Sequence, residues 1–174
     1  MTSETHYKIQ KILGKGSTGQ VYEGIDQRNG QSVVIKRQYL DLNEITISTE
    51  IDVLTQINCQ HPNLMCLKDI IYGQDKGEKY VDIILQYEPN VYSLEFRSDL
   101  SFSHLLLIMT NVTLAVQFLH QKGILHLDIK PANILINDDT QTFLIDYGLS
   151  CFQEGYQPVS TKRPAILTKF TSWR

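Results

Sequence analysis

The sequence contains little cysteine, and its cysteines form no pattern. Three cysteines stand among 174 residues, with no Cys-x-x-Cys pair and no cysteine and histidine cluster of zinc spacing. They are Cys59, Cys66 and Cys151. The odd number and the spacing argue against a zinc module, and they predict three reduced, mostly buried thiols in a cytoplasmic or nuclear protein.

Clusters of basic residues and long apolar runs are scarce as well. The formal net charge is −3, whereas a nucleic-acid-binding domain carries a basic patch, so no nucleic-acid partner is expected. The longest apolar run, near Leu105 to Met109, is too short to cross a bilayer, and the polar start MTSETHYKIQ does not fit a signal peptide. We therefore expect no membrane partner.

The residues that are present suffice for one folded domain. Hydrophobic residues make up 42% of the chain and charged residues 20%, which is typical of a globular protein. A chain of 174 residues has room for one compact domain with a real core and is short for two.

The first half of the chain alternates in the manner of strands and contains one helix. Residues 7–37 predict a three-stranded antiparallel meander, because alternating segments are broken by glycines and by an Asn-Gly turn. Residues 44–57 carry apolar side chains at helical spacing. Residues 64–72 and 80–87 then predict two strands, joined by a polar loop over 73–79.

The second half begins with the longest helical stretch, residues 101–121. Ser101 or Ser103 can cap its start, and Gly123 can end it. Its apolar residues cover more than one face, so we expect the helix to be buried on all sides. Short apolar pieces at 134–136 and 143–145 follow, and together these elements predict an α+β fold.

Three glycines lie in the first expected hairpin, in the segment Gly14-Lys15-Gly16-Ser17-Thr18-Gly19. Glycine lets a backbone approach phosphate oxygens closely and point N–H groups at them. A Gly-x-Gly-x-x-Gly pattern also marks Rossmann turns, but those open a helix, whereas a strand follows here. The remaining alternative is a merely flexible hairpin.

Lys36 ends the β-branched run Val33-Val34-Ile35. Alone, such a lysine is most simply a residue of an edge strand. One hairpin after a glycine loop, it can reach phosphates held by that loop, provided that a carboxylate fixes its direction. Glu50 and Glu44 on the expected helix are the candidates, and Glu50 is preferred because it directly precedes apolar positions of the helical pattern.

A group of polar residues suited to phosphoryl transfer follows the long helix, at Asp128, Lys130, Asn133 and Asp146. Such a reaction needs an oriented hydroxyl, neutralised charge and excluded water more than covalent help. Asp128 can accept the hydroxyl proton, and Lys130 can neutralise the transferred group. The carbonyl oxygen of Asn133 and the carboxylate of Asp146 suit a hard cation such as Mg²⁺, and Gly148 allows a sharp turn.

These segments together resemble the signature of protein kinases. The quoted pieces are the glycine loop, Val-Val-Ile-Lys ending at Lys36, His-Leu-Asp-Ile-Lys-Pro-Ala-Asn at 126–133 and Asp-Tyr-Gly at 146–148. The resemblance implies a two-lobed kinase fold with Mg²⁺ and ATP bound between the lobes. Residues 1–88 would form the N-lobe and hinge, and residues 89–174 the start of the C-lobe through the activation segment.

The loop with Lys130 resembles the serine/threonine class, because tyrosine kinases usually carry arginine where this sequence has that lysine. The resemblance therefore implies an enzyme that transfers the γ-phosphoryl group of ATP to serine and threonine hydroxyls. ATP, Mg²⁺ and a protein substrate with such hydroxyls are the ligands and partners that it implies.

The resemblance also implies roles around the nucleotide. Leu85 would be the gatekeeper, and Gln86 to Glu88 would be the hinge whose backbone pairs with adenine. The adenine pocket would be lined by Leu13, Val21, Val34 and Leu135. Four stacked side chains would link the lobes: Leu54, Leu67, His126 and Tyr147. His126 is therefore expected to be a packing residue and not a base.

Some positions depart from the family pattern. Leu127 replaces the usual arginine of His-Arg-Asp, which commonly pairs with a phosphate on the activation loop, so this loop is not expected to wait for phosphorylation. Gln86 replaces an acid of the hinge, with little consequence for backbone pairing. The catalytic loop is similar to that of Mos-type kinases, and Asp-Tyr-Gly-Leu is similar to several viral kinases.

The sequence ends at Arg174, before the Ala-Pro-Glu motif, so the resemblance implies an incomplete, truncated kinase domain. Without the later helices, the helix at 101–121 would expose an apolar face, which another kinase or a chaperone could cover. A second hypothesis is therefore a nucleotide-binding decoy or regulator of another kinase. A small-molecule phosphotransferase of kinase-like fold is the third, and it is disfavoured because such proteins usually lack the Lys-Pro-x-Asn loop.

Overall fold

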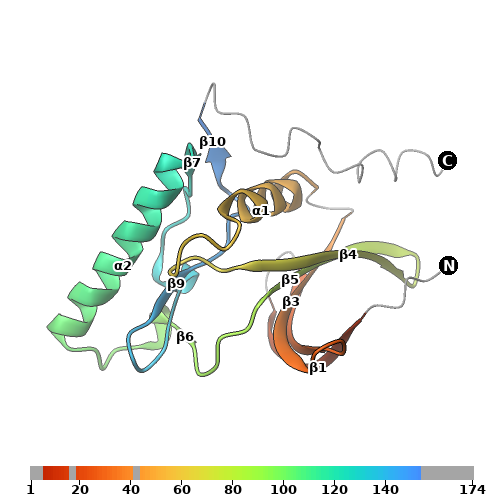
Figure 1. Ribbon diagram of the computed structural model, residues 1–174, viewed down its shortest axis with the longest axis horizontal. Helices are drawn as coiled ribbons and strands as arrows, with labels where there is room; N and C mark the ends of the chain where they lie inside the picture. The colour runs from red at the N-terminus through yellow and green to blue at the C-terminus, as the bar shows by residue number, and fades with distance from the viewer. Residues whose placement is uncertain (1–5, 16–18, 41–43, 154–174) are drawn as a thin grey trace.

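A five-stranded antiparallel sheet forms one end of the molecule (Figure 1). The computed structural model describes residues 6–15, 19–40 and 44–153, and the strands of this sheet lie in the order β1-β2-β3-β5-β4. They are β1 (Tyr7–Lys15), β2 (Gly19–Asp26), β3 (Gln31–Tyr39), β4 (Leu67–Asp75) and β5 (Glu78–Gln86). The predicted meander over residues 7–37 is confirmed, since β1, β2 and β3 pair in sequence order.

The connection between β4 and β5 differs from the predicted loop over residues 73–79. Both strands continue until Asp75 pairs with Glu78, so that only Lys76 and Gly77 remain in the turn. These two residues have φ of 49° and 90°, the left-handed geometry of tight hairpin turns that match strand twist. The polar composition concealed the strand ends because this tip of the hairpin is exposed to solvent.

Helix α1 (Glu44–Ile57) has the predicted bounds and lies over the sheet beside β4 (Figure 1). Its apolar side chains, among them Leu54 and Ile57, join residues of β5 and of the second long helix in one buried cluster. A single core therefore runs from the sheet through α1 into the other lobe.

Short strands position the loops of the second lobe. β6 (Tyr92–Ser93), β8 (Ile134–Ile136) and β9 (Thr142–Leu144) form a three-stranded sheet, and β7 (Ile124–Leu125) pairs with β10 (Cys151–Phe152). Two 3₁₀ turns, η1 (Leu94–Phe96) and η2 (Pro131–Asn133), complete the described elements. Residues 126–133 therefore run from β7 into β8, and residues 145–150 run from β9 to β10.

Helix α2 (Phe102–Gln121) forms the other end of the molecule (Figure 1). Of the two serines predicted to cap the helix, Ser101 does so, since its side chain accepts a hydrogen bond from the His104 N–H at 3.3 Å. Gly123, with φ of 67°, follows the helix. One face is buried, through Ile108, Val112, Ala115 and Leu119. The fold is thus a β-rich lobe with one helix and a partly helical lobe, the α+β architecture that was predicted.

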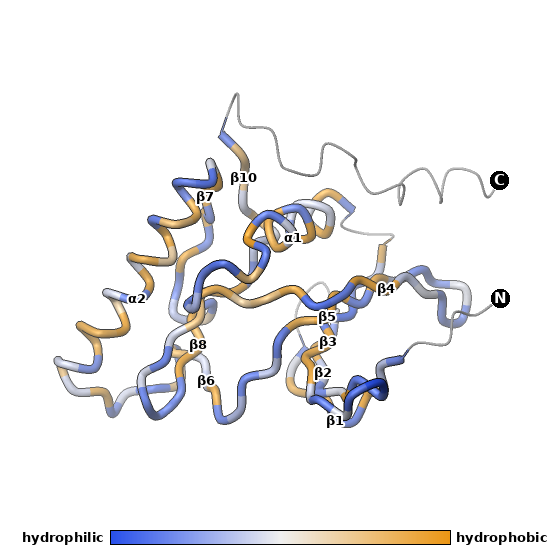
Figure 2. Tube along the Cα trace, in the orientation of Figure 1, coloured by the Kyte–Doolittle hydropathy of each residue, from blue (hydrophilic) through white to orange (hydrophobic). Residues whose placement is uncertain are grey.

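The prediction that α2 is buried on all sides is wrong. The tube of α2 is coloured as apolar along much of its length (Figure 2). The large apolar side chains on it that are exposed are Phe102, Leu105, Leu106, Leu107, Met109 and Leu114. The reason is that the described elements that contact the helix, β7 and β9 among them, leave the opposite face uncovered. The apolar face that the resemblance implied is therefore present.

Helix α2 is also long enough and apolar enough to span a membrane, the only such helix among the residues that the structure describes. The sequence-based expectation counted only the run near Leu105 to Met109. The whole helix qualifies because its polar residues include no Asp, Glu, Lys or Arg. A core helix can meet the same criterion, and the full burial of Ile108 and Ala115 places α2 against the core of this domain.

Truncating the two faces of α2 should have unequal effects on stability. Leu119→Ala should lower the free energy of unfolding by about 2.5–5 kcal/mol, because three fully buried carbon atoms are lost and a cavity is left. Leu114→Ala makes the same change at a side chain that is 46% exposed, so its cost should be near ~1 kcal/mol. Urea denaturation measures both, and equal losses would contradict the one-sided packing.

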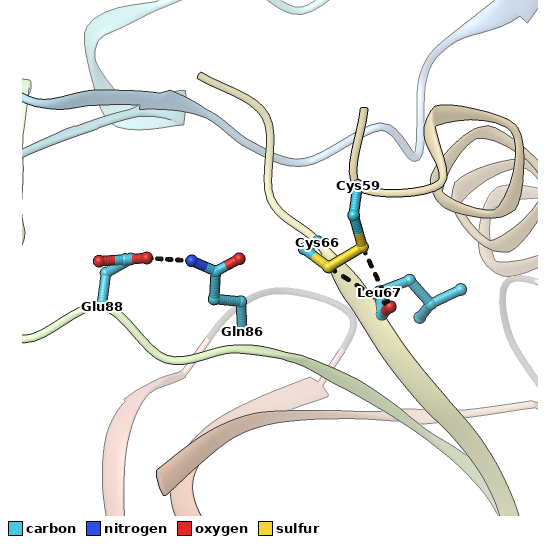
Figure 3. The surroundings of a disulfide bond; sticks show 5 residues. All are labelled: Cys59, Cys66, Leu67, Gln86 and Glu88. Atoms are coloured by element: carbon cyan, nitrogen blue, oxygen red, sulfur yellow. Dashed lines mark hydrogen bonds between the residues drawn. A yellow bond between two sulfur atoms is a disulfide. The ribbon is translucent and has the colours of Figure 1, made fainter. Parts of the chain in front are cut away.

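Cys59 and Cys66 form a disulfide, with Cα atoms 4.5 Å apart (Figure 3). The prediction of three reduced, mostly buried thiols is therefore wrong. Cys66 is buried, but Cys59 is exposed, and so is Cys151, the free cysteine of the described residues. The spacing of the cysteines in the sequence did not indicate this pair, because the pair depends on a turn. Asn58 and Cys59 have φ of 46° and 56°, and the chain folds back after α1 toward β4.

Candidate active site

Lys36 lies on β3 with its ammonium group between two carboxylates. Strand alternation puts Val34, Lys36 and Gln38 on one face of the sheet. The Lys36 Nζ atom donates to both carboxylate oxygens of Glu50 at 2.6 and 2.8 Å and to Oδ1 of Asp146 at 3.2 Å. Burial alone would lower the pKa of Lys36, but the two carboxylates outweigh it and raise this pKa above its ordinary value. The lysine is therefore held in its charged form.

Glu50, and not Glu44, is the partner of this lysine, as the sequence indicated. Glu50 is 2% exposed on the inner face of α1, whereas Glu44 is exposed in the first turn. The Oε2 atom of Glu50 also accepts a hydrogen bond from Nε2 of Gln38 at 3.2 Å. Gln38 was not among the predicted site residues. Gln38 could have been predicted from the sequence, because it stands two residues after Lys36 and therefore lies on the same face of the strand.

Asp128, Lys130 and Asn133 come together in the loop between β7 and β8. The Lys130 Nζ atom lies 2.9 Å from Oδ2 of Asp128, and the Asn133 amide donates to Oδ2 and the backbone oxygen of Asp128 at 2.8 and 2.9 Å. The hydrogen bond from Lys130, with help from Asn133, lowers the pKa of Asp128 against the effect of burial. Asp128 is thus ionised at neutral pH, and Oδ1 of Asn133 is left for a cation.

The backbone of this loop follows from two local features. Pro131 begins η2, and Lys130 before it is extended, as expected for a residue that precedes proline. The Asn133 N–H then donates to the Lys130 carbonyl at 2.9 Å. Leu127 has a left-handed φ of 62° and a side chain that is 62% exposed, so the turn directs Leu127 to solvent.

His126 is a packing residue, as the resemblance implied. It is buried, its Nδ1 accepts from the Asp128 N–H at 3.2 Å, and its Nε2 lies 3.1 Å from the Ile145 carbonyl oxygen. Because Nδ1 accepts, Nε2 carries the proton and donates to that carbonyl. Burial lowers the pKa of His126 below its ordinary value, so the ring is neutral at pH 7, and both of its nitrogens are already engaged in these two hydrogen bonds.

The side chains predicted to stack between the lobes lie close to one another. Leu54 and Tyr147 belong to the main buried cluster, and Leu67 packs against it. The rings of His126 and Tyr147 meet edge to face, with centroids 5.4 Å apart. The segment after β9 is thereby packed against α1 and β4 at once.

Stability should fall as the pH drops below about 6.5, the ordinary pKa of histidine. Since the folded pKa of His126 is depressed, the unfolded state binds the proton more readily, and stability present above that pH is lost toward the folded pKa. Burial also lowers the pKa of His61, which acts in the same window. In a His61→Gln variant, the free energy of unfolding, measured by urea denaturation, should therefore still fall with pH, but by less. A free energy of unfolding that does not change with pH in this variant would contradict the buried neutral state of His126.

The segment Asp146-Tyr147-Gly148 passes close to α1. Asp146 has a left-handed φ of 66°, and the buried hydroxyl of Tyr147 donates to the Leu144 carbonyl at 2.7 Å. Gly148 lies in a turn, as predicted, and the Ser150 N–H closes this turn by donating to the Tyr147 carbonyl at 3.0 Å. The position also lies close to α1, since a Cβ atom there would lie 2.5 Å from Cγ2 of Thr46.

The glycine loop is described only at its two ends. Gly14 and Lys15 end β1, Gly19 begins β2, and Gly16 and Ser17 lie outside the described residues. A Cβ atom on Gly14 would meet open space. A Cβ atom on Gly19 would lie 1.9 Å from the Arg37 carbonyl oxygen, so the close packing of β2 on β3 already demands glycine at that position.

Three of the residues predicted around adenine, Val21, Val34 and Leu85, share one face of the sheet. Val21 pairs with Lys36 across β2 and β3, and Val34 pairs with Leu85 across β3 and β5. Directly paired residues share a face, and so do residues two apart on one strand. Leu85 is buried, Val21 and Val34 are half-buried, and Leu13 on β1 is exposed. Leu135, half-buried on β8, comes from the other lobe.

The predicted hinge begins where the pairing of β4 with β5 ends. The backbone N–H of Gln86 donates to the Cys66 carbonyl at 2.9 Å, and the Gln86 side chain donates to Glu88. Figure 3 shows Gln86 and Glu88 near the disulfide. The start of the hinge is therefore fixed to the residue that carries one half of that bond.

The oxygen donors of the site fit Mg²⁺ with a nucleotide. The Asn133 amide oxygen and the Asp146 carboxylate are hard ligands, and the Asp146 side chain is 46% exposed and so accessible to a cation. Within the described part of the chain, no group of three or more His, Cys, Asp or Glu forms a competing metal centre. Lys36 adds a fixed positive charge beside the same carboxylate.

A sheet lysine paired with a glutamate of the adjoining helix, set against a loop with clustered aspartate, lysine and asparagine, defines a protein-kinase-like domain. The family model described as protein kinase domain matches residues 7–168. This chain belongs to the protein kinase family.

Several curated proteins are similar to the chain. Mitogen-activated protein kinase 13 of Oryza sativa subsp. indica is 30% identical over 156 residues, which cover 84% of this chain and 30% of that protein. MAP3K epsilon protein kinase 1 of Arabidopsis thaliana is 32% identical over 160 residues, 86% of this chain and 11% of that protein. A probable serine/threonine-protein kinase of Dictyostelium discoideum is 34% identical over 143 residues, 78% and 22% respectively. The chain spans at most 30% of the length of these three relatives.

Proposed function

We propose that this chain binds ATP with Mg²⁺ and transfers the γ-phosphoryl group to serine and threonine hydroxyls of proteins. The observation that carries the proposal is that Asp146 joins the two polar groups of the site. It pairs with Lys36, and the residue before it, Ile145, donates its N–H to the carbonyl of Asn133 in the catalytic loop at 2.9 Å. The phosphate-directing lysine and the catalytic loop are therefore parts of one site.

Each residue has a role that its contacts support. Lys36, held by Glu50, would orient the phosphates, since a lysine fixed by a carboxylate presents its charge in one direction. Asp128, kept ionised, would accept the proton of the substrate hydroxyl. Lys130, which lies within reach of Asp128, would neutralise charge on the transferred group.

The remaining residues would hold the nucleotide. Asn133 and Asp146 would bind Mg²⁺, which when bound would neutralise the phosphates and bridge their oxygens. The apolar sheet face with Val21, Val34 and Leu85 would cover the adenine ring and exclude water from it. ATP and Mg²⁺ are thus the ligands to test first.

The direct test is transfer by the purified chain. It is incubated with ATP labelled on the γ-phosphate, Mg²⁺ and generic protein acceptors, and label on serine and threonine is then measured. Label on these residues supports the proposal, and label on a small molecule alone would favour a small-molecule phosphotransferase. Tight ATP binding without any transfer would overturn the enzyme assignment.

We further propose that the catalytic loop is active without phosphorylation of the activation segment. Leu127 stands where kinases of the Arg-Asp type carry their phosphate-binding arginine, and its exposed apolar side chain offers no charge to a phosphorylated activation segment. Asp128 is instead held by Lys130 and Asn133 within the loop itself.

A second candidate function is favoured by the exposed face of α2. Apolar side chains such as Leu106 and Met109 are more than half exposed, and a patch of this kind marks an interaction surface. The chain would then be a nucleotide-binding decoy or regulator that docks there on another kinase, or is held there by a chaperone. The cytoplasm or nucleus, the location we propose, would supply such partners.

A further inference from the structure

The Cys59–Cys66 disulfide lies between the two parts that position the nucleotide site. Cys59 stands two residues after α1, the helix that holds Glu50 against Lys36. Cys66 stands directly before β4, and its carbonyl accepts the N–H of Gln86 at 2.9 Å. One covalent bond thus connects the end of α1 to the strand that fixes the start of the hinge (Figure 3).

The segment inside the disulfide ring is anchored to the other lobe. Nδ2 of Asn63 donates to the Thr142 carbonyl at 2.9 Å, and the Leu144 N–H donates to the Asn63 carbonyl at 2.9 Å. Nζ of Lys122 donates to Oε1 of Gln60 at 2.8 Å. The residues between the two cysteines are therefore held by β9 and the end of α2, and the turn before them is the part that can move.

That turn has an unfavourable backbone. Asn58 and Cys59 are consecutive residues with φ of 46° and 56°, a region that residues other than glycine rarely adopt and that persists only where the surroundings impose it. The disulfide is one such constraint, since it holds Cys59 against the start of β4. Once the bond is broken, the turn can leave this conformation and the end of α1 can shift with it.

We propose that Cys59 and Cys66 form a reversible redox site that controls the position of α1. The oxidised form fixes α1 with Glu50 on Lys36 and binds the nucleotide more tightly, and the reduced form loosens this pair. The effect on nucleotide binding rests on the proposed function. Disulfides in the cytoplasm are typically transient and redox-sensing, which agrees with a site whose exposed member, Cys59, is reached first by a reagent.

The chemistry requires a two-electron oxidant of the peroxide class. The Cys59 thiolate attacks a peroxide oxygen, the O–O bond breaks, and Cys59 becomes a sulfenic acid while one water leaves after protonation. The Cys66 thiolate then attacks the Cys59 sulfur, the S–S bond forms, the S–O bond breaks and a second water leaves. A dithiol reverses the step: it supplies two electrons and two protons and is itself converted to a disulfide.

The test compares the oxidised and reduced chain without any substitution. Hydrogen peroxide and dithiothreitol set the oxidised and reduced states. The mass of the intact chain distinguishes them, because the disulfide form is lighter by two hydrogens. We expect amide hydrogen exchange over residues 44–57 to be faster in the reduced chain, and ATP with Mg²⁺ to bind about five-fold more weakly. The Cys59→Ser and Cys66→Ser variants should match the reduced chain in both states, and Cys151→Ser should still respond to oxidation.

The outcomes separate this inference from the proposed function. Equal exchange over 44–57 in both states, or no disulfide mass under peroxide, would overturn the redox site whatever ATP does. Faster exchange in the reduced chain together with weaker ATP binding supports the whole inference. Faster exchange with no ATP binding in either state would retain the control of α1 and overturn both the effect on nucleotide binding and the proposed kinase function.

Discussion

An Asp128→Asn variant should transfer phosphoryl groups about 10²–10⁴-fold more slowly than the unchanged chain, the range for loss of a positioned general base. Asp128 carries the carboxylate that the loop keeps ionised, through Lys130 Nζ at 2.9 Å and the Asn133 amide at 2.8 Å. Asparagine fills the same space but cannot accept the proton of the substrate hydroxyl. The measurement is the rate of label transfer from ATP to protein serine and threonine, with excess acceptor.

The control for this substitution is Asp75→Asn, at an exposed residue beside the β4–β5 turn. It makes the same chemical change far from the loop and should leave the rate unaltered. ATP affinity should be the same in both variants, since Asp128 contacts neither Lys36 nor Glu50. Equal transfer by the unchanged chain and Asp128→Asn would remove Asp128 from the reaction.

The local elements were predictable because their signals are local. The helix Glu44–Ile57 has its exact predicted bounds, since apolar residues at helical spacing and a following proline define it without help from the rest of the chain. The pairing of Lys36 with Glu50 was also predictable. Strand alternation and the helical pattern each place one of these two residues toward the other.

Features that depend on contacts between distant segments were not predictable. The burial of α2 depends on which elements cover it, and its composition alone wrongly indicated burial on all sides. The Cys59–Cys66 pair depends on the left-handed backbone of Asn58 and Cys59, and nothing in the sequence around these two residues indicated it. Backbone geometry of this kind is set by the folded surroundings and not by residue type.

The glycines show how a motif can be right for a partly different reason. Gly148 lies in the turn to which it was assigned, and its lack of a side chain also allows the segment to approach Thr46. Gly19 was assigned to phosphate binding, yet strand packing against Arg37 alone requires it. A glycine pattern therefore marks positions where close approach is possible, while the group that approaches, as at Gly19, is identified only in three dimensions.

Lys36→Met should lower the free energy of unfolding by about 3 kcal/mol, the scale for removing one partner of a buried ion pair. Glu50 is 2% exposed, and without the ammonium group its remaining side-chain hydrogen bond within the described part of the chain is that from the Gln38 amide at 3.2 Å. Burying an uncompensated carboxylate is costly, and methionine cannot relieve it. Lys68→Met, at an exposed residue of β4, is the matched control and should change stability by less than about 0.5 kcal/mol.

The double variant Lys36→Met with Glu50→Gln separates the structural role of the pair from its role toward ATP. Glutamine removes the buried charge, so the double variant should be more stable than Lys36→Met, and the two losses should not add. ATP affinity should not recover, because no cation remains on this strand face to direct the phosphates. Urea denaturation and titration with ATP and Mg²⁺ measure the two properties. Additive losses would contradict direct coupling between Lys36 and Glu50, and restored ATP binding would show that the lysine serves only the fold.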